Sequence, residues 1–154
     1  MPSSRPAQSP PANVHATAAE RLRRDGQRYT SSRRSLVEVL EATDRPLTIP
    51  ELLTLRTGIP QSSAYRNLAV LERAGVVDRV VATDEFARYE LAEDLTEHHH
   101  HMICAACGSV SDFVMEPAAE RRLDSAADVI AADAGFQVAS HRFDLLGHCA
   151  DCAS

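Results

Sequence analysis

The four cysteines of this chain form two Cys-x-x-Cys pairs, Cys104 with Cys107 and Cys149 with Cys152. Two residues between paired thiols let both sulfurs reach one metal at about 2.3 Å, and four thiolates complete a tetrahedron around Zn²⁺. Disulfide bonds are the alternative, but in a reducing cytosol paired cysteines more often bind metal. The spacing therefore predicts a structural zinc site that ties together two distant parts of a small domain.

A run of four histidines, His98 to His101, directly precedes the first cysteine pair. On an extended segment, successive side chains point to opposite faces. His98 and His100 then face one way, and His99 and His101 face the other. The run predicts two separate metal half-sites, with a solvated polar stretch as the alternative interpretation.

The half-site of His98 and His100 can be completed from the later part of the chain. His141 could add a third imidazole. Glu120 or Asp124 could add a carboxylate, because residues four apart lie on one face of a helix.

The half-site of His99 and His101 needs donors from earlier residues. Asp78 is one candidate, and Glu90 or Glu93 is another. A site of this composition would bridge the two halves of the chain.

Capping signals in the first half predict short helices followed by a hairpin. Thr30-Ser31-Ser32 can cap a helix, Thr48 opens a capping box, and Ser62 or Ser63 can cap a third helix that Gly75 ends. Two β-rich segments then follow, separated by a turn at 82–85. This order predicts a winged helix-turn-helix.

The second half has an α/β pattern. Strands are expected at 110–114 and 136–146, with a helix from Pro117 to Ala134 between them. The fold class is therefore α+β, a winged helix followed by a small α/β domain. The expected division is a disordered tail at 1–17, a winged-helix domain at 18–91, a hinge at 92–97 and a metal-binding domain at 98–154.

Charge is distributed unevenly along the chain. The net charge is −6, yet residues 1–90 carry 13 arginines against 11 acidic residues, whereas the remainder carries 3 against 11. Basic residues crowd one stretch, Arg21 to Arg34, which is typical of a nucleic-acid-binding surface or of a solvated helix face. No apolar run approaches the roughly 20 residues that span a bilayer, so we expect a cytoplasmic protein without a membrane partner.

The third helix has the residues that a DNA-reading helix needs. In a major groove, Arg66 could pair with a guanine edge while hydroxyl groups hold phosphates. The candidate DNA-binding residues are Ser62, Ser63, Tyr65, Arg66, Asn67 and, from the basic stretch, Arg28.

These motifs together resemble the ferric uptake regulator family of bacterial metal sensors, over a span from about Arg21 to Ser154. The residues that carry the resemblance are Ser63-Ala64-Tyr65-Arg66-Asn67-Leu68, Ala74-Gly75-Val76-Val77, Tyr89-Glu90-Leu91, His98 to His101, Met102-Ile103-Cys104, Cys107-Gly108, His141, Gly147-His148-Cys149 and Cys152. The resemblance implies a homodimeric repressor that binds double-stranded operator DNA, with a C-terminal dimerisation domain.

The resemblance also implies roles for the metal-binding candidates. The cysteines match the structural zinc site. The other two sets are a sensing site of Asp78, Glu90, His99 and His101 and a dimerisation-domain site of His98, His100, Glu120 and His141.

Departures from the family pattern bear on which metal is sensed. Pro46 stands where iron-sensing members have a histidine, and Asp78 stands where zinc-sensing members have an aspartate. The cysteine that zinc sensors often add is absent, and Glu90 matches a glutamate of iron sensors. This hybrid set favours a zinc uptake regulator, with Fe²⁺ or Mn²⁺ as the alternative ion at the sensing site.

Two other classes of protein were weighed against a regulator. A zinc hydrolase would use Glu97 and the histidine run, but the chain lacks a His-Glu-x-x-His motif and two filled ligand sets leave no open position for water. A metal buffer without DNA binding would not need a winged helix. The sequence therefore predicts a non-enzymatic regulator.

Overall fold

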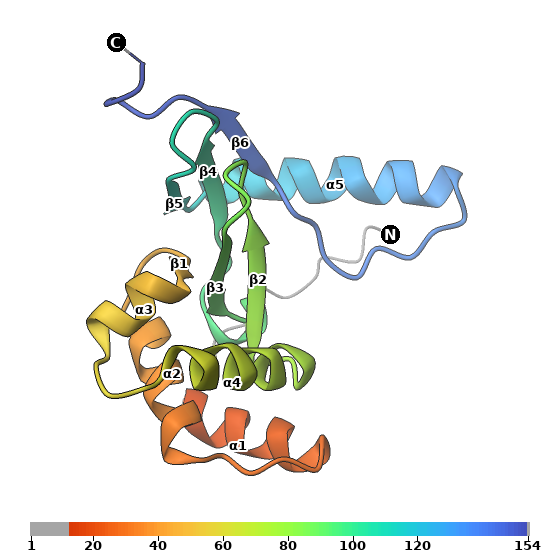
Figure 1. Ribbon diagram of the computed structural model, residues 1–154. Helices are drawn as coiled ribbons and strands as arrows, with labels where there is room; N and C mark the ends of the chain where they lie inside the picture. The colour runs from red at the N-terminus through yellow and green to blue at the C-terminus, as the bar shows by residue number, and fades with distance from the viewer. Residues whose placement is uncertain (1–12, 154) are drawn as a thin grey trace.

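The computed structural model describes residues 13–153, and Figure 1 shows two groups of elements joined by a long hairpin. The elements of the first group are α1 (Val14–Arg24), α2 (Ser31–Glu41), β1 (Leu47–Thr48), α3 (Ile49–Leu55), α4 (Gln61–Arg73), β2 (Val77–Val81) and β3 (Ala87–Leu91). A 3₁₀ turn, η1 (Glu93–Leu95), leads to the second group, β4 (His100–Cys104), β5 (Val110–Phe113), α5 (Pro117–Asp133) and β6 (Asp144–Gly147).

Helix caps follow the signals in the sequence. Thr30 accepts a hydrogen bond from the Arg33 amide at the start of α2, and Thr48 with Glu51 forms a reciprocal capping box at the start of α3. The cap of α4 differs from the prediction, because Pro60 occupies the N-cap and Ser62 and Ser63 lie inside the first turn. Proline has no backbone N–H, so at the start of a helix it leaves no donor without an acceptor. The helix can therefore begin at Gln61, before either serine.

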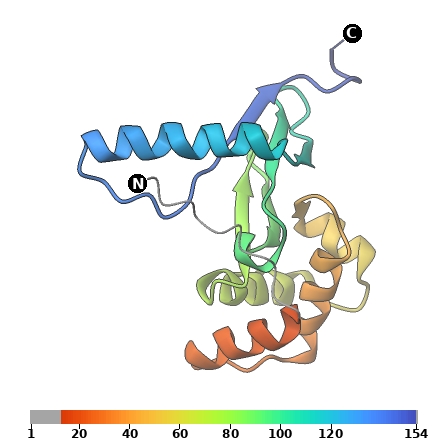
Figure 2. The same cartoon turned by 180° about the vertical axis from the view of Figure 1, so that it is seen from behind.

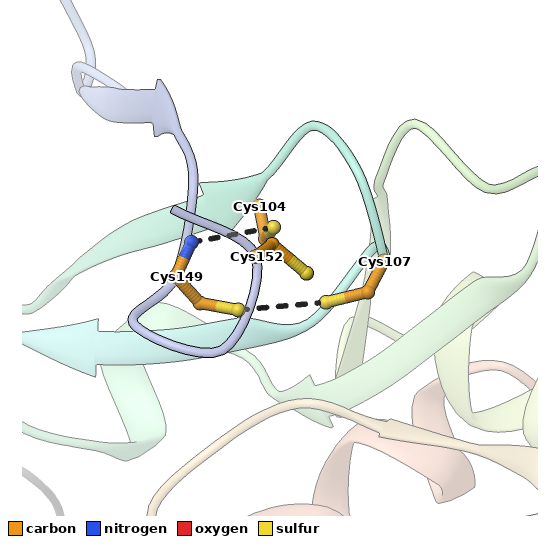
Figure 3. Close-up of side chains that lie close together, drawn as sticks. All are labelled: Cys104, Cys107, Cys149 and Cys152. Atoms are coloured by element: carbon orange, nitrogen blue, oxygen red, sulfur yellow. Dashed lines mark hydrogen bonds between the residues drawn. The ribbon is translucent and has the colours of Figure 1, made fainter. Parts of the chain in front are cut away.

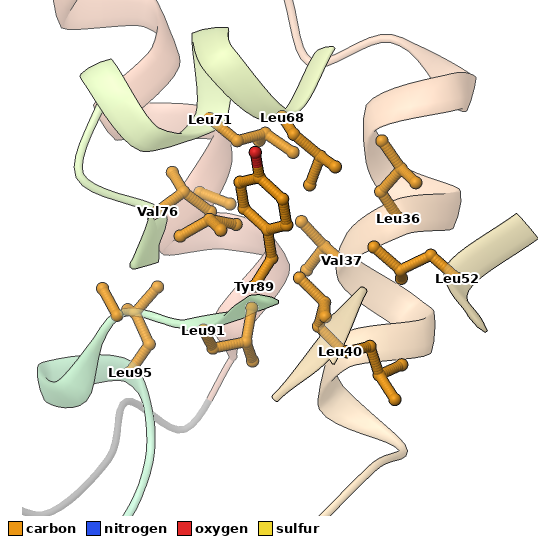
Figure 4. Close-up of a cluster of buried hydrophobic side chains, with 14 of the residues drawn as sticks. Leu36, Val37, Leu40, Leu52, Leu68, Leu71, Val76, Tyr89, Leu91 and Leu95 are labelled. Carbon is orange, nitrogen blue, oxygen red and sulfur yellow. The ribbon is translucent and has the colours of Figure 1, made fainter. Parts of the chain in front are cut away.

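The first group has one continuous core. Leucine and valine side chains from α1 to η1 pack together, including Leu36, Leu68 and Leu95, all at most 2 % exposed (Figure 4). Strands β1, β3 and β2 form an antiparallel sheet in that order beside the helices. The predicted winged helix is thus present, and η1 is part of its core.

The start of the ordered chain differs from the prediction. The structure has helix from Val14, and Val14 and Ala18 are buried, so residues 14–17 do not belong to a disordered tail. Asn13 caps this helix by accepting a hydrogen bond from the Ala16 amide. Residues 1–12 of the predicted tail lie outside the described part of the chain.

The second group is a small sheet with the order β5-β4-β6, in which β4 and β6 run parallel. The predicted strand at 136–146 is wrong for residues 136–143, because the strand that pairs with β4 is Asp144–Gly147, and His141 lies in the preceding loop. Helix α5 projects beside this sheet and buries only Ala131 (Figure 2). Few apolar side chains are therefore available to stabilise this half.

Burial predicts how the first group responds to truncation. Leu68→Ala should lower the free energy of unfolding by about 2–5 kcal/mol, because it leaves a cavity in a closed core. Leu55→Ala is the matched control, since Leu55 is 58 % exposed and its loss should change stability by less than about 0.5 kcal/mol. Urea unfolding followed by circular dichroism measures both, and equal effects would contradict this description of the core.

Candidate metal centres and nucleic-acid interface

The four cysteines converge where β4 ends and the segment after β6 returns (Figure 3). All four are free thiols, so the disulfide alternative does not hold here. The Sγ atoms of Cys107 and Cys149 are 3.8 Å apart, which matches the edge of a tetrahedron with bonds of about 2.3 Å. Parallel pairing of β4 with β6 brings the two knuckles together, because β4 ends at Cys104 and β6 ends at Gly147, two residues before Cys149.

Backbone amides favour the thiolate form at this cysteine site. The Cys149 amide donates to Cys104 Sγ at 3.4 Å. Amide hydrogen bonds from Cys107 and Cys149 lower the pKa of Cys104 to about 6, whereas hydrogen bonding to Cys149 raises the pKa of Cys152 to about 12. A group of thiolates and thiols that compete for protons fits a divalent cation, which would bind all four as thiolates and offset part of their negative charge.

A second cluster lies between the hairpin and the second sheet, and we call it the hinge site. Its members are Glu90, His99, His101 and Asp112, whose donor atoms lie within 4.8 Å of one another. Both imidazoles donate from Nε2 to the same Glu90 oxygen, at 3.2 Å for His99 and 3.0 Å for His101. One carboxylate from β3 thus meets two imidazoles from the other half of the chain.

Asp112 completes the hinge site, and the sequence analysis missed it. It lies on β5 directly opposite His101 in the antiparallel register, a position that the predicted strands could have indicated. Among the residues that the structure describes, its Oδ1 is one of two buried side-chain oxygen or nitrogen atoms without a hydrogen-bond partner. A buried acceptor of this kind costs free energy unless a further group satisfies it, so the site fits a cation.

Asp78 and Glu93, the other candidates for this site, lie beside it but are not among its four converging donors. Asp78 is opposite Glu90 in the β2–β3 register and accepts a hydrogen bond from the Glu93 amide at 3.3 Å. The Glu93 carboxylate contacts His98 Nδ1 instead. Asp78 lines the same cavity of about 360 Å³ as Glu90 and His99, but it is outside the group of four converging donors.

Protonation of the hinge site reflects its crowding. Burial acts to raise the pKa of Glu90, but hydrogen bonds from His101 and His99 outweigh it and lower that pKa to about 2. The Glu90 hydrogen bond raises the pKa of His99 to about 9 against the effect of burial. Burial raises the pKa of Asp112 to about 6. Without a metal, the imidazole protons balance the carboxylate charge.

The remaining histidines form a third cluster around Glu120 of α5, which we call the second histidine site. His98, His100 and His141 each place Nε2 within 2.9–3.0 Å of a Glu120 oxygen. Asp124, the alternative carboxylate, lies 3.2 Å from His141 Nδ1 and so orients that ring from behind. The predicted opposite facing of alternate histidines is present, since the two clusters share no residue.

Partners on the outer ring nitrogens support a metal-binding role. His99 Nδ1 donates to the Glu97 carbonyl at 2.9 Å, and His101 Nδ1 lies 3.3 Å from Asp144 Oδ1. Histidine ligands in metal sites usually hold one nitrogen this way while the other faces the ion. In each of the three clusters the donors present fit a divalent cation. Its positive charge would stabilise the thiolates of the cysteine site and the carboxylates of the two histidine sites.

The predicted DNA-reading residues lie along one side of α4. Ser62, Tyr65 and Arg66 are exposed, with Tyr65 at 53 %. Arg66 donates to Ser63 Oγ at 3.4 Å, and Arg33 Nε donates to Asn67 Oδ1 at 3.1 Å. Asn67 is therefore held by α2, whereas the others remain accessible.

Arg28 is also exposed, just before α2, and Arg33 donates to its carbonyl oxygen. The exposed cations beside α4 give this face the charge that phosphate binding requires. No helix among residues 13–153 is long and apolar enough to cross a bilayer.

Comparison with known proteins identifies the family. The model of the ferric uptake regulator family matches residues 24–146. The chain belongs to the ferric uptake regulator family. It is 35 % identical over 140 residues to the ferric uptake regulation protein of Campylobacter jejuni, covering 85 % of this chain and 83 % of that protein.

Solved structures agree with this assignment. The Helicobacter pylori ferric uptake regulator, described as having three functional metal-binding sites, superposes with a TM-score of 0.69 at 25 % identity over 92 % of this chain and 95 % of that one. A zinc-bound manganese uptake regulator gives a TM-score of 0.60 at 29 % identity, over 86 % and 98 %. The family consists of metal-binding transcription regulators that form dimers, so the protein is a regulator and not an enzyme.

The cysteine site predicts a clear effect of one substitution. Cys104→Ser should remove one zinc per chain and unfold the second group of elements, whose own apolar core is small, while the first group stays folded. Ala105→Ser is the matched control on the same knuckle, because Ala105 is exposed. Metal analysis with amide hydrogen exchange checks both, and full zinc content in Cys104→Ser would contradict the assignment.

The hinge site predicts a pH-dependent metal affinity. The pKa of His99 is raised to about 9, so a metal that binds this imidazole at lower pH must displace its proton. For each proton displaced, the affinity of the hinge site for metal should fall about tenfold per pH unit below pH 9. Glu90→Gln should flatten this dependence between pH 7 and 8, because the pKa of His99 returns toward its ordinary value. Zn²⁺ titration against a chelator at pH 6.5–8 measures the slope, and a pH-independent affinity would contradict the description.

Proposed function

We propose that this protein is a homodimeric repressor that binds operator DNA when a divalent metal occupies Glu90, His99, His101 and Asp112, and that the sensed ion is Zn²⁺. The observation that carries the proposal is the origin of these donors. Glu90 belongs to the winged-helix half, whereas the other three belong to the second half. Binding at this site therefore requires both halves to adopt one relative arrangement.

Linkage connects this arrangement to DNA. Metal that binds only the closed form favours that form, and DNA that needs the same form binds more tightly as a result. In a dimer, the two copies of α4 must be spaced by one or more helical turns of DNA to enter successive major grooves. Exposed apolar residues around α5, including Ile130 and Phe136 at 70 % and 67 % exposed, support a dimer contact on that face.

Zinc is proposed because two imidazoles and two carboxylates supply the four donors of a tetrahedral site. Asp78, whose position favoured zinc in the sequence, is not among these four donors. The preference for zinc therefore depends on the number and type of the donors that converge. Fe²⁺ or Mn²⁺ is the second candidate, since carboxylate oxygens suit harder ions and one structural relative is a manganese uptake regulator. Operator binding places the protein in the cytoplasm.

The proposal predicts separate roles for the histidines. His99→Ala should abolish metal-stimulated operator binding, with at least a tenfold loss at saturating metal, yet leave a folded dimer with its cysteine-bound zinc. His15→Ala, outside all three clusters, is the control. Fluorescence anisotropy with an operator duplex at buffered free Zn²⁺, Fe²⁺ and Mn²⁺ measures both function and metal preference. Unchanged metal stimulation in His99→Ala would contradict the proposal.

A further inference from the structure

The turn between β2 and β3 lies directly on the first cysteine knuckle. We call residues 82–86 the wing turn and residues 104–109 the first knuckle. Thr83 donates a hydrogen bond of 3.3 Å from Oγ1 to the carbonyl of Cys104. These residues belong to opposite halves of the chain, so the contact is a second connection between the halves, separate from the hinge site.

Gly108 allows the closest approach in this contact. A Cβ atom at this position would collide with the Asp84 carboxylate and lie 2.7 Å from Asp84 Cβ, so one of the two residues would have to move. Its φ of +71° also favours glycine. The side chain of Asp84 therefore occupies the space that any other residue at 108 would fill.

Arg88 holds Asp84 against the knuckle. Its two terminal nitrogens donate to the two Asp84 oxygens, each at 2.7 Å, and Arg88 itself is 7 % exposed. A bidentate pair that is largely removed from water is more rigid than a surface ion pair. The hydrogen bond from Arg88 lowers the pKa of Asp84, so the pair stays charged at neutral pH.

The same strand carries the donor of the hinge site. Arg88 and Glu90 are two residues apart on β3, so their side chains leave the same face of the sheet. A rigid contact at Arg88 thus limits where Glu90 can lie relative to His99 and His101.

We propose that the wing turn and the first knuckle form a latch, in which Asp84 is a positioning residue that holds Glu90 ready for metal. The latch acts without the sensed ion, because its contacts use no metal donor of the hinge site. It raises the fraction of molecules in which the site is assembled, and apparent metal affinity scales with that fraction. This inference rests on the proposed function, which takes the hinge site as the place where the sensed metal binds.

Asp84→Ala in the full-length protein tests the latch. With zinc at the cysteine site and none at the hinge site, amide exchange should accelerate at residues 83–88. The free Zn²⁺ needed to half-saturate the hinge site should rise about three- to tenfold, as it would if the assembled fraction fell by that factor. Operator affinity at saturating Zn²⁺ should remain unchanged. Glu85→Asn is the matched control, because Glu85 is exposed on the same turn and asparagine tolerates its φ of 62°.

A second variant separates positioning from simple damage to the turn. Arg88→Ala should also raise the half-saturating Zn²⁺ concentration, because it removes the two hydrogen bonds that hold Asp84 against the knuckle and it lies on β3, outside the turn. The double variant with Asp84→Ala should resemble Asp84→Ala alone, since the two side chains act through one interaction. Additive effects, a change of less than twofold in Asp84→Ala, or an equal change in Glu85→Asn would overturn the latch. If the natural protein binds Zn²⁺ but not operator DNA, the proposed function is wrong. The amide exchange rates and the Zn²⁺ titrations of the variants still test the latch in that case.

Discussion

The shared carboxylate of Glu90 is the interaction on which the relation between the two halves depends. Two imidazoles donate to one of its oxygens, and they come from His101 on β4 and from His99 just before that strand. This geometry keeps a charged group inside the molecule only while protons or a cation balance it. The residues that connect the two halves are thus the residues whose charge must be neutralised. Binding a cation at these residues therefore also joins the two halves.

The two halves are stabilised in different ways. The winged helix has a closed leucine and valine core, whereas the second half buries few apolar residues, among them Ile103, Val110 and Ala131. Such a small core cannot offset the conformational entropy of its chain without further bonds. Thiolates at the ends of β4 and β6 meet this need, because one ion there would join two strands that are parallel and distant in sequence. Helix α5 adds little to this core, since it leaves large apolar side chains such as Val129 and Ile130 exposed.

Local sequence signals predicted much of this architecture. The Thr48 capping box, the glycine at 75 and the histidine alternation depend on neighbours in the chain, so they are readable without tertiary information. The hinge-site donor from β5 was not predicted, because it depends on register across a turn. Asp78, which was predicted, and Asp112, which was not, carry the same carboxylate, and only the pairing of strands shows which one lies opposite His101. The early part of the predicted 136–146 strand failed for a similar reason, since alternation alone does not supply a partner strand.

The hairpin β2–β3 is held at two places, and their difference matters for how a signal passes through it. Near its tip, Thr83 and Asp84 contact the first knuckle without any ion. Near its base, Glu90 meets the hinge site, whose carboxylates need a cation or protons. A hairpin held only at the base would spend less time in the arrangement that brings Glu90 to the histidines, so a higher metal concentration would be needed to fill the site. Contact at the tip holds the hairpin near that arrangement, so the cation at the base completes a geometry that is already largely formed.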